Sequence, residues 1–248
     1  MTRVLVAGES WSVTSIHTKG FDSFTTVDYQ EGGAALLGAL KAGGFDVTYM
    51  PCHVAATDFP WTVEELDEYD VVLLSDVGAN TFLLPAQTFV AGQQTGNRLR
   101  VLRDWVRAGG GFGMVGGYMS FQGIEAKANY RSTPLADILP VELEIGDDRE
   151  ESPEGVRAHL IGQHPITEGI DAEFPPLLGY QRFESSPSAS VLAAFSDEAP
   201  LLVVNHEGAG RTLAYASDIG PHWAPTEFTD WAGFSRLWQQ AVAWLGGR

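Results

Sequence analysis

Short apolar segments alternate with segments of helical spacing along the first half of the chain. The apolar segments have lengths typical of strands and occupy residues 3–7, 46–50, 70–75 and 112–115. Between them, apolar residues recur every three or four positions over residues 32–42 and 97–108, which predicts helices with one buried face. Strands that alternate with helices across short links favour an α/β fold with a mostly parallel, right-handed sheet.

Local signals mark the ends of several of these elements. Gly43 and Gly44 follow the first helical segment, at a place where helices commonly end. Glu65 comes three residues after Thr62, which is the spacing of a capping box at the start of a helix. The apolar run at residues 70–75 is typical of a strand that is covered on both faces.

The second half of the chain has shorter and less regular elements. Its pattern predicts a short helix followed by an extended segment at 134–144, a charged loop at 147–151, and strands at 191–194, 201–205 and 212–217. Residues 207–211 are typical of a hairpin turn, and residues 231–245 form an aromatic-rich amphipathic helix. No repeat or low-complexity linker interrupts the chain, so we expect one domain over residues 1–248.

The glycine-rich stretch at residues 109–123 is the most informative local signal. A buried strand at 112–115 runs into Gly116 and Gly117, and polar side chains follow at once. Such a turn can lift one side chain to the carboxyl edge of an α/β sheet, where a nucleophilic Cys or Ser is expected. Here the residue at the apex is Tyr118.

Charge and cysteine content exclude several classes of protein. With 32 acidic and 15 basic residues the net charge is −17, which argues against nucleic acid or an anionic membrane as a partner. We interpret the acidic surface first as a source of solubility. Cys52 is the only cysteine, so neither an intrachain disulfide nor a Cys-based zinc cluster can form.

The chain shows no targeting or membrane segment. Residues 1–8 enter a strand directly, without the apolar region and cleavage site of a signal peptide. A run of about 18 apolar residues, as a membrane span needs, is also absent. We therefore expect a cytoplasmic protein.

Segments along almost the whole chain resemble the class I glutamine amidotransferase-like superfamily. The resemblance is strongest to its subgroup of about 250 residues called putative glutamine amidotransferases. The matching segments are 8–11 (GESW), 17–24 (HTKGFDSF), 75–81 (SDVGANT), 116–123 (GGYMSFQG), 147–149 (DDR), 175–180 (PPLLGY) and 217–223 (SDIGPHW). The resemblance implies a flavodoxin-like three-layer sandwich and says little about the reaction.

The resemblance breaks at the residues that would hydrolyse glutamine. Amidotransferases carry a nucleophilic Cys in Gly-x-Cys-x-Gly and a later His-x-Glu pair. Here Tyr118 takes the place of the Cys, and His222 matches the histidine but is followed by Trp223 and Ala224. Cys52 follows the second predicted strand and cannot replace the missing nucleophile. We therefore expect no glutaminase activity.

Other chemistry is still open at the carboxyl edge of the predicted sheet, where doubly wound folds bind ligands. We expect the loop at residues 17–22 to fold over that edge. The candidate catalytic residues are Glu9, Tyr118, Ser120 and His222. The candidate substrate-binding residues are Trp11, His17, Lys19, Asp22, Asp76, Asn80, Gln122, Asp148 and Arg149.

Each candidate also has a purely structural alternative. Glu9 could cap a helix, Asp76 could bind local backbone amides, and residues 147–149 could be a charged turn. Lys19 and Asp22 could form an ordinary solvated ion pair. The tryptophans could be packing residues rather than ligand platforms. Tyr118 is the sharpest candidate, because the apex of a turn exposes its side chain.

Two functional classes follow from these observations. The first is a hydrolase or related enzyme that acts on a small polar metabolite, with His222 as general base, Tyr118 or Ser120 as proton donor or weak nucleophile, and Glu9 or Asp76 as the orienting carboxylate. The second is a noncatalytic module for ligand binding or for assembly of a homo-oligomer.

A divalent metal is a weaker variant of the enzyme hypothesis. It would be held by His17, His53 or His222 together with Asp22 or Asp76. The chain has no His-x-x-x-His pair or equivalent spacing to support such a site, and we expect no resident metal. The sequence identifies no other cofactor.

Overall fold

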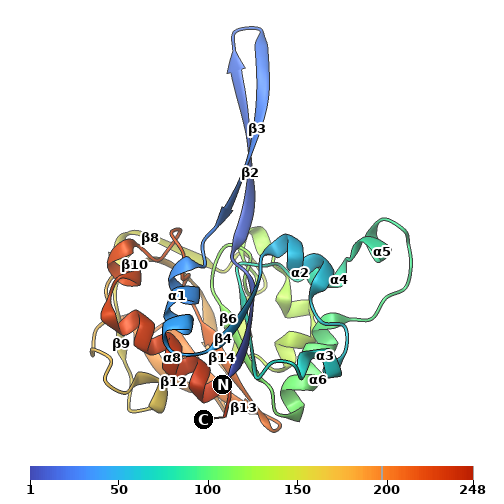
Figure 1. Ribbon diagram of the computed structural model, residues 1–248. Coiled ribbons are helices and arrows are strands. Elements are labelled where there is room, and N and C mark those ends of the chain that lie inside the picture. Colours follow the sequence, from blue (N-terminus) through green and yellow to red (C-terminus); the bar gives the residue numbers. More distant parts are fainter. Residues whose placement is uncertain (197, 248) are drawn as a thin grey trace.

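An eight-stranded, mostly parallel sheet forms the centre of the molecule (Figure 1). The structure is a computed structural model that describes residues 1–196 and 198–247. In spatial order the parallel strands are β4 (Asp46–Met50), β1 (Arg3–Gly8), β5 (Val71–Ser75), β6 (Gly111–Val115) and β14 (Gly210–Tyr215). This order, with the first strand between the second and third of the parallel set, is that of flavodoxin-like folds. The predicted α/β fold class is therefore confirmed.

Three further strands continue the sheet beyond β14 in antiparallel pairings. They are β13 (Pro200–Glu207), β12 (Ser190–Phe195) and β9 (Ala158–Leu160). Apart from a projecting hairpin, two smaller two-stranded sheets lie outside the central one. They pair β7 (Val141–Leu143) with β11 (Phe183–Ser185), and β8 (Arg149–Val156) with β10 (Leu177–Gln181).

Helices on both sides of the central sheet complete the layers (Figure 1). Helices α1 (Ala34–Ala42) and α8 (Ala232–Leu245) pack against each other on one side. On the other side, α6 (Arg98–Ala108) packs against α3 (Val63–Leu66). The remaining short helices are α2 (Cys52–Asp58), α4 (Asn80–Leu83), α5 (Ala86–Phe89) and α7 (Thr226–Thr229). No helix in the described part of the chain is long and apolar enough to cross a membrane.

Most elements predicted from hydrophobic spacing occur with nearly the expected bounds. The strand at residues 46–50 is β4, and the strand at 70–75 is β5 without its first residue. The capping box forms, since the Thr62 side chain accepts a hydrogen bond from the Glu65 N–H and the Glu65 carboxylate accepts one from the Thr62 N–H. Helix α6 begins after Asn97, whose side chain caps it by accepting from the Arg100 N–H.

The charged segment at residues 147–151 differs from its prediction. We expected a loop, but strand β8 begins at Arg149 and pairs with β10. Three of the eight residues of β8 are glutamates, and it also contains Pro153 and Gly155; all of these residue types are depleted in strands. The segment forms a strand because tertiary pairing with β10 overrides its weak local preference.

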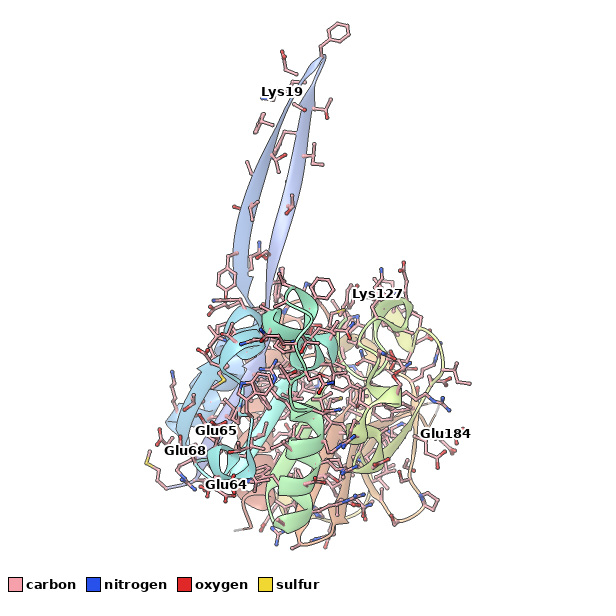
Figure 2. All side chains as sticks on the ribbon, turned by 90° about the vertical axis from the view of Figure 1, so that its right-hand side faces the viewer. Lys19, Glu64, Glu65, Glu68, Lys127 and Glu184 are labelled. Atoms are coloured by element: carbon pink, nitrogen blue, oxygen red, sulfur yellow. The ribbon has the colours of Figure 1, made fainter. Side chains whose placement is uncertain are left out.

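A long hairpin projects from the body of the molecule between β1 and α1 (Figure 1). We call this hairpin the arm; it consists of β2 (Ser10–Lys19) and β3 (Asp22–Glu31), paired without interruption from Ser10↔Glu31 to Lys19↔Asp22. The prediction that residues 17–22 fold over the sheet edge is therefore wrong. Figure 2 shows Lys19 at the far end of the arm.

One buried arginine ties three helices together on the α6 side of the sheet. Arg98, at the start of α6, has no exposed surface. Its guanidinium donates to the carbonyl oxygens of Ala55, Ala56, Thr81 and Phe82 at 2.9–3.2 Å. These carbonyls belong to α2 and α4, and the Trp61 ring lies 4.4 Å from the guanidinium carbon. Burial lowers the pKa of Arg98 to about 10.

Candidate functional site

The parallel strands end level with one another at one edge of the sheet. Gly8 of β1 pairs with Ser75 of β5, and Ser75 pairs with Val115 of β6. The residues that follow these strands are therefore neighbours at the carboxyl edge. After β1 the chain first adds β4 on one side of it, and it then adds β5 and the later strands on the other side. The strand order therefore reverses between β1 and β5, and such folds bind ligands at this switch point.

The backbone turns sharply at this switch point. Glu9 and Asp76, the first residues beyond β1 and β5, have φ angles of 51° and 43°. Residues other than glycine rarely adopt this left-handed backbone conformation, and such backbone strain tends to occur at functional sites. The turn also needs a glycine before Glu9, because a Cβ on Gly8 (φ +112°) would lie 1.9 Å from the Ser75 carbonyl oxygen. These two residues with strained backbones thus follow neighbouring strand ends, and the Glu9 N–H donates to the Ser75 carbonyl oxygen at 2.7 Å.

Three buried carboxylates form the floor of the site. Glu9 accepts from the Ser75 hydroxyl at 2.5 Å through one oxygen, while its other oxygen has no hydrogen-bond partner. Asp218 lies two residues after Ala216, just beyond the end of β14. Its carboxylate accepts from the N–H groups of Ile219 and Gly220 at 2.6 and 2.9 Å. Asp76 accepts from the Met119 N–H at 2.6 Å. Glu9 and Asp218 have no exposed surface.

Burial and repulsion from neighbouring charges raise the pKa values of Glu9 and Asp76 on this floor. Burial, with the nearby charges of Asp218 and Asp76, raises the pKa of Glu9 well above its usual range. Burial and the charge of Asp218 raise the pKa of Asp76 to about 6. Glu9 and Asp76 therefore keep their protons to a higher pH than ordinary carboxyl groups, and ionising them beside a further anion would be disfavoured.

His222 has an acidic partner on the floor. Its Nδ1 lies 3.6 Å from Oδ2 of Asp218, four residues earlier in the chain. The side chain of His222 is 35% exposed, whereas that of Asp218 is fully buried. Asp218 raises the pKa of His222 against the opposing effect of burial. We expected Glu9 or Asp76 to orient His222, whereas the acid beside its ring is Asp218.

Aromatic rings and one guanidinium surround His222. The Trp11 ring lies 4.7 Å from the His222 ring, centre to centre, and the Tyr118 ring is stacked at 5.5 Å with an angle of 20°. The guanidinium of Arg149 lies 4.9 Å from the Tyr118 ring centre. Arg149 in turn forms ion pairs with Asp147 and Glu151 at 2.9 and 3.2 Å. The apex of the glycine turn thus meets His222, as the sequence predicted.

Three predicted site residues hold the turn after β6 instead of facing the site. The Ser120 hydroxyl donates to the Val115 carbonyl at 2.5 Å and accepts from the Asp76 N–H at 3.0 Å. Asp148 accepts from the N–H groups of Gln122 and Gly123 at 2.9 and 2.8 Å. The Gln122 side-chain oxygen accepts from the Arg131 N–H at 2.9 Å. These bonds favour the structural alternative for all three residues.

Four other predicted residues lie elsewhere. His17, Lys19 and Asp22 belong to the outer half of the arm, where His17 stacks on Phe24 with ring centres 4.6 Å apart. The structure therefore does not bring them to His222. Asn80 begins α4 and is exposed. Within the described residues, no group of three or more His, Cys, Asp or Glu side chains is arranged to hold a metal ion.

The sequence prediction missed several residues of the site. Trp223 donates from its ring N–H to Glu151 at 3.0 Å, and its ring lies 5.5 Å from that of Tyr118. Gln181 of β10 binds both backbone groups of Gly117, accepting from the N–H at 3.3 Å and donating to the carbonyl. Asp218 was expected at this edge because it follows a predicted strand, but no role was assigned to it. Glu151 and Gln181 reach the site through the unpredicted β8–β10 pairing.

The Asp76→Asn variant is expected to gain stability over the native protein as the pH rises. A carboxyl with a raised pKa stabilises the fold below its unfolded pKa of about 3.8, and this contribution is lost as the pH rises through about 6. Asparagine does not titrate and can still accept from the Met119 N–H. Between pH 4 and 7 the difference in unfolding free energy should change by up to about 3 kcal/mol in favour of the variant. Urea unfolding at several pH values measures this.

Asp58→Asn, at an exposed position of α2, is the matched control and should show no comparable trend. A difference between Asp76→Asn and the native protein that stays constant over this pH interval would contradict the buried-carboxylate description of the floor.

Comparison with known proteins identifies the family of this chain. A family model named GATase1-like, with the description "Putative glutamine amidotransferase", matches residues 3–247. The chain belongs to this GATase1-like family. The resemblance inferred from the sequence segments is thereby confirmed. A search of curated proteins found no match to the chain.

Solved structures include close relatives of this GATase1-like chain. Two are described as cytoplasmic proteins from Salmonella typhimurium, with 42% and 43% sequence identity and TM-scores of 0.94 and 0.95. Each match covers 98% of this chain and 98% or 99% of the relative. A ThuA-like protein from Bacteroides uniformis has 12% identity and a TM-score of 0.58, over 98% of this chain and 91% of that one. This last likeness concerns the fold alone.

Proposed function

We propose that this GATase1-like protein is a hydrolase or related enzyme that acts on a small polar metabolite at the carboxyl edge of its sheet. The observation that carries the proposal is the Asp218–His222 pair, with a buried acid behind a half-exposed imidazole. A buried carboxylate beside a histidine orients the ring and stabilises its protonated form. His222 is then the general acid–base of the site.

The surroundings of His222 restrict the substrate. Trp11 and Tyr118 flank the imidazole and offer apolar faces to a flat or ring-shaped group. The carboxylate floor disfavours phosphate or carboxylate groups above it, whereas hydroxyl, amide or amino groups suit it. We therefore propose a neutral or cationic, hydrogen-bonding substrate, such as a sugar-like or amide-containing metabolite.

The other residues of the site have distinct roles in this proposal. Tyr118 contacts the substrate and is the proton donor or weak nucleophile, with Arg149 over its ring. Glu9 is fully buried and acts as a positioning residue: it shapes the field around Asp218 and anchors the two strand ends through Ser75. His222 takes a proton from water or from a substrate hydroxyl, and Asp218 stabilises the resulting imidazolium.

Thiol-dependent glutamine hydrolysis is not part of the proposal. Tyr118 follows the glycine turn where the thiol of an amidotransferase would be expected. The only thiol, Cys52, begins α2 with its sulfur 3.7 Å from the Asp76 carbonyl oxygen. Burial raises the pKa of Cys52, which disfavours the reactive thiolate. We expect no release of ammonia from glutamine at an enzymatic rate.

A screen of small polar metabolites for thermal stabilisation tests the proposal. A ligand at 100 times its Kd stabilises the native state by about 2.7 kcal/mol, which raises Tm by roughly 5–10 °C for a chain of this size. His222→Ala and Tyr118→Phe are expected to lose most of this shift, while the exposed His159→Ala should keep it. Metabolites that bind are then incubated with the protein and analysed for products by mass spectrometry.

The alternative is a noncatalytic module for ligand binding or assembly, which the projecting arm favours. Binding that depends on His222 without any product would support this alternative over the enzyme. A ligand that stabilises the native protein and both site variants equally would contradict the assignment of the site itself.

A further inference from the structure

The arm exposes one uncharged face along its length. Strand alternation places Thr14, Ile16, Thr25 and Val27 on the same face, where Ile16 is 74% and Val27 65% exposed. Ser12, Thr18, Ser23 and Tyr29 extend this face, and only Glu31 at the root adds a charge. We call it the β-branched face. Its composition is typical of strands that pack against another surface.

The opposite face of the arm is different in kind. It carries His17, Lys19, Asp22 and Asp28. Its apolar residues are Trp11, Val13 and Phe24; the ring of Phe24, which is 50% exposed, is partly covered by its own neighbours, since His17 stacks on it and the Lys19 ammonium lies 5.6 Å from the ring centre. This face is suited to water. The asymmetry indicates that the β-branched face is the one that is covered in the functioning protein.

The arm also lacks support from its own chain. Its outer half projects away from the body (Figure 1), and the ring of Tyr29 against His53, 5.3 Å apart, contacts α2 only near the root. Isolated two-stranded hairpins are marginally stable in water unless another element covers them. The uninterrupted ten-residue pairing of β2 and β3 therefore calls for a partner surface.

A second uncharged surface protrudes from the same body. Residues 77–97 contain no Asp, Glu, Lys or Arg, in a chain whose net charge is −17. This segment includes α4 and α5 and forms a lobe to the side of the arm, on the right in Figure 1. Phe89 and Val90 on the lobe are 74% and 80% exposed. Beside them lies a hollow of about 530 Å³, lined by residues between Leu83 and Asn97.

We propose that the β-branched face of the arm packs on this uncharged lobe in a second copy of the same chain. Every copy carries both surfaces, so a two-fold dimer forms the contact twice, arm to lobe in each direction. Two strongly acidic bodies repel each other, and a contact between charged surfaces would add to that repulsion. An arm of ten residue pairs reaches roughly 34 Å, several times the screening length of about 8 Å at physiological ionic strength.

The area of the two surfaces favours a dimer with two arm-to-lobe contacts over an assembly held by one such contact. One face of a two-stranded arm offers roughly 300 Å², well below the approximately 800 Å² that each partner buries in a standard interface. A chain that contributes both its arm and its lobe offers about twice the arm area. This comes closer to the requirement for a specific assembly.

The experiment measures the oligomeric state by sedimentation at micromolar concentrations. The native protein should sediment as a dimer or larger assembly. Ile16→Lys on the β-branched face and Phe89→Glu on the lobe should each raise the dissociation constant by at least about 30-fold. Ser15→Lys places the same charge one residue away on the opposite face of the arm and should leave the assembly intact.

Mixing the two defective variants distinguishes the arm-to-lobe contact from other arrangements. In a mixed dimer of Ile16→Lys and Phe89→Glu chains, one contact joins two unaltered surfaces. The other joins the two altered ones, whose introduced charges are opposite. Mixed dimers should therefore form although neither variant dimerises alone.

Three results would overturn the proposal: a monomeric native protein, an assembly that Phe89→Glu leaves unchanged, or no recovery on mixing. Circular dichroism checks that the variants are folded. Metabolite binding at His222 is measured separately, so failure of this proposal is distinguishable from failure of the proposed function.

Discussion

Arg98→Met is expected to lower the free energy of unfolding by about 3–5 kcal/mol. The Arg98 side chain is fully buried and donates to four backbone carbonyl oxygens. Two of them belong to residues 55 and 56 of α2, and two to residues 81 and 82 of α4.

 Methionine keeps the bulk of the side chain but removes every donor. Each buried carbonyl left without a partner costs about 1–3 kcal/mol, and relief from burying the guanidinium charge offsets part of this cost. Urea unfolding of the native and variant proteins measures the difference.

Two variants on the same helix sharpen this measurement. Arg100→Met alters an exposed arginine of α6 and should change stability by no more than about 0.5 kcal/mol. Arg98→Lys keeps the charge but has fewer donors, so its loss should be intermediate. If Arg98→Met were as stable as Arg100→Met, the hydrogen bonds of Arg98 would not be what holds α2, α4 and α6 together.

Asp218→Asn is expected to have the largest effect on the site. In the native protein Asp218 raises the pKa of His222, while burial lowers it. Removing this carboxylate leaves only the smaller effects of Asp76 and Glu151 to oppose burial, so the pKa of His222 should fall. If the proposed function is correct, turnover should also fall by roughly 10²–10⁴, because the imidazolium formed during catalysis loses its stabilising charge. Titration of the His222 ring by NMR measures the pKa without any substrate.

Asparagine is a suitable replacement because its side-chain oxygen can still accept from the N–H groups of Ile219 and Gly220. Glu227→Gln removes an exposed charge from α7 nearby in the sequence and should leave the titration of His222 unchanged. An unaltered pKa of His222 in Asp218→Asn would contradict the pairing on which the proposed chemistry depends.

The sequence predicted the parallel core well because hydrophobic burial determines it. β5 is buried at every position, and a continuous apolar run is the sequence pattern of such a strand. Helix α6 was predictable for two reasons: its buried face repeats with helical spacing, and Asn97 caps its start. The strand ends then fixed where polar residues gather, which is why Glu9, Tyr118 and His222 were among the candidates.

The arm and β8 could not be predicted in this way. Thr14, Ile16, Thr25 and Val27 are exposed on the isolated chain, so no buried face imposes a pattern of apolar and polar positions. β8 forms through long-range pairing with β10, which local sequence does not encode. The resemblance to amidotransferases also directed attention to the residues after His222, whereas the acid that pairs with it comes earlier in the chain.

The root of the arm has a consequence for how this family can diverge. The chain leaves the body at Ser10 and returns at Glu31, two residues that pair directly. Just below them, the Gly32 N–H closes the opening by donating to the Glu9 carbonyl at 3.0 Å. An excursion that starts and ends at one point can be lengthened, shortened or lost at little thermodynamic cost to the rest of the fold. Evolution can therefore change the outer part of the arm independently of the sheet, whereas Trp11 at its root remains beside His222.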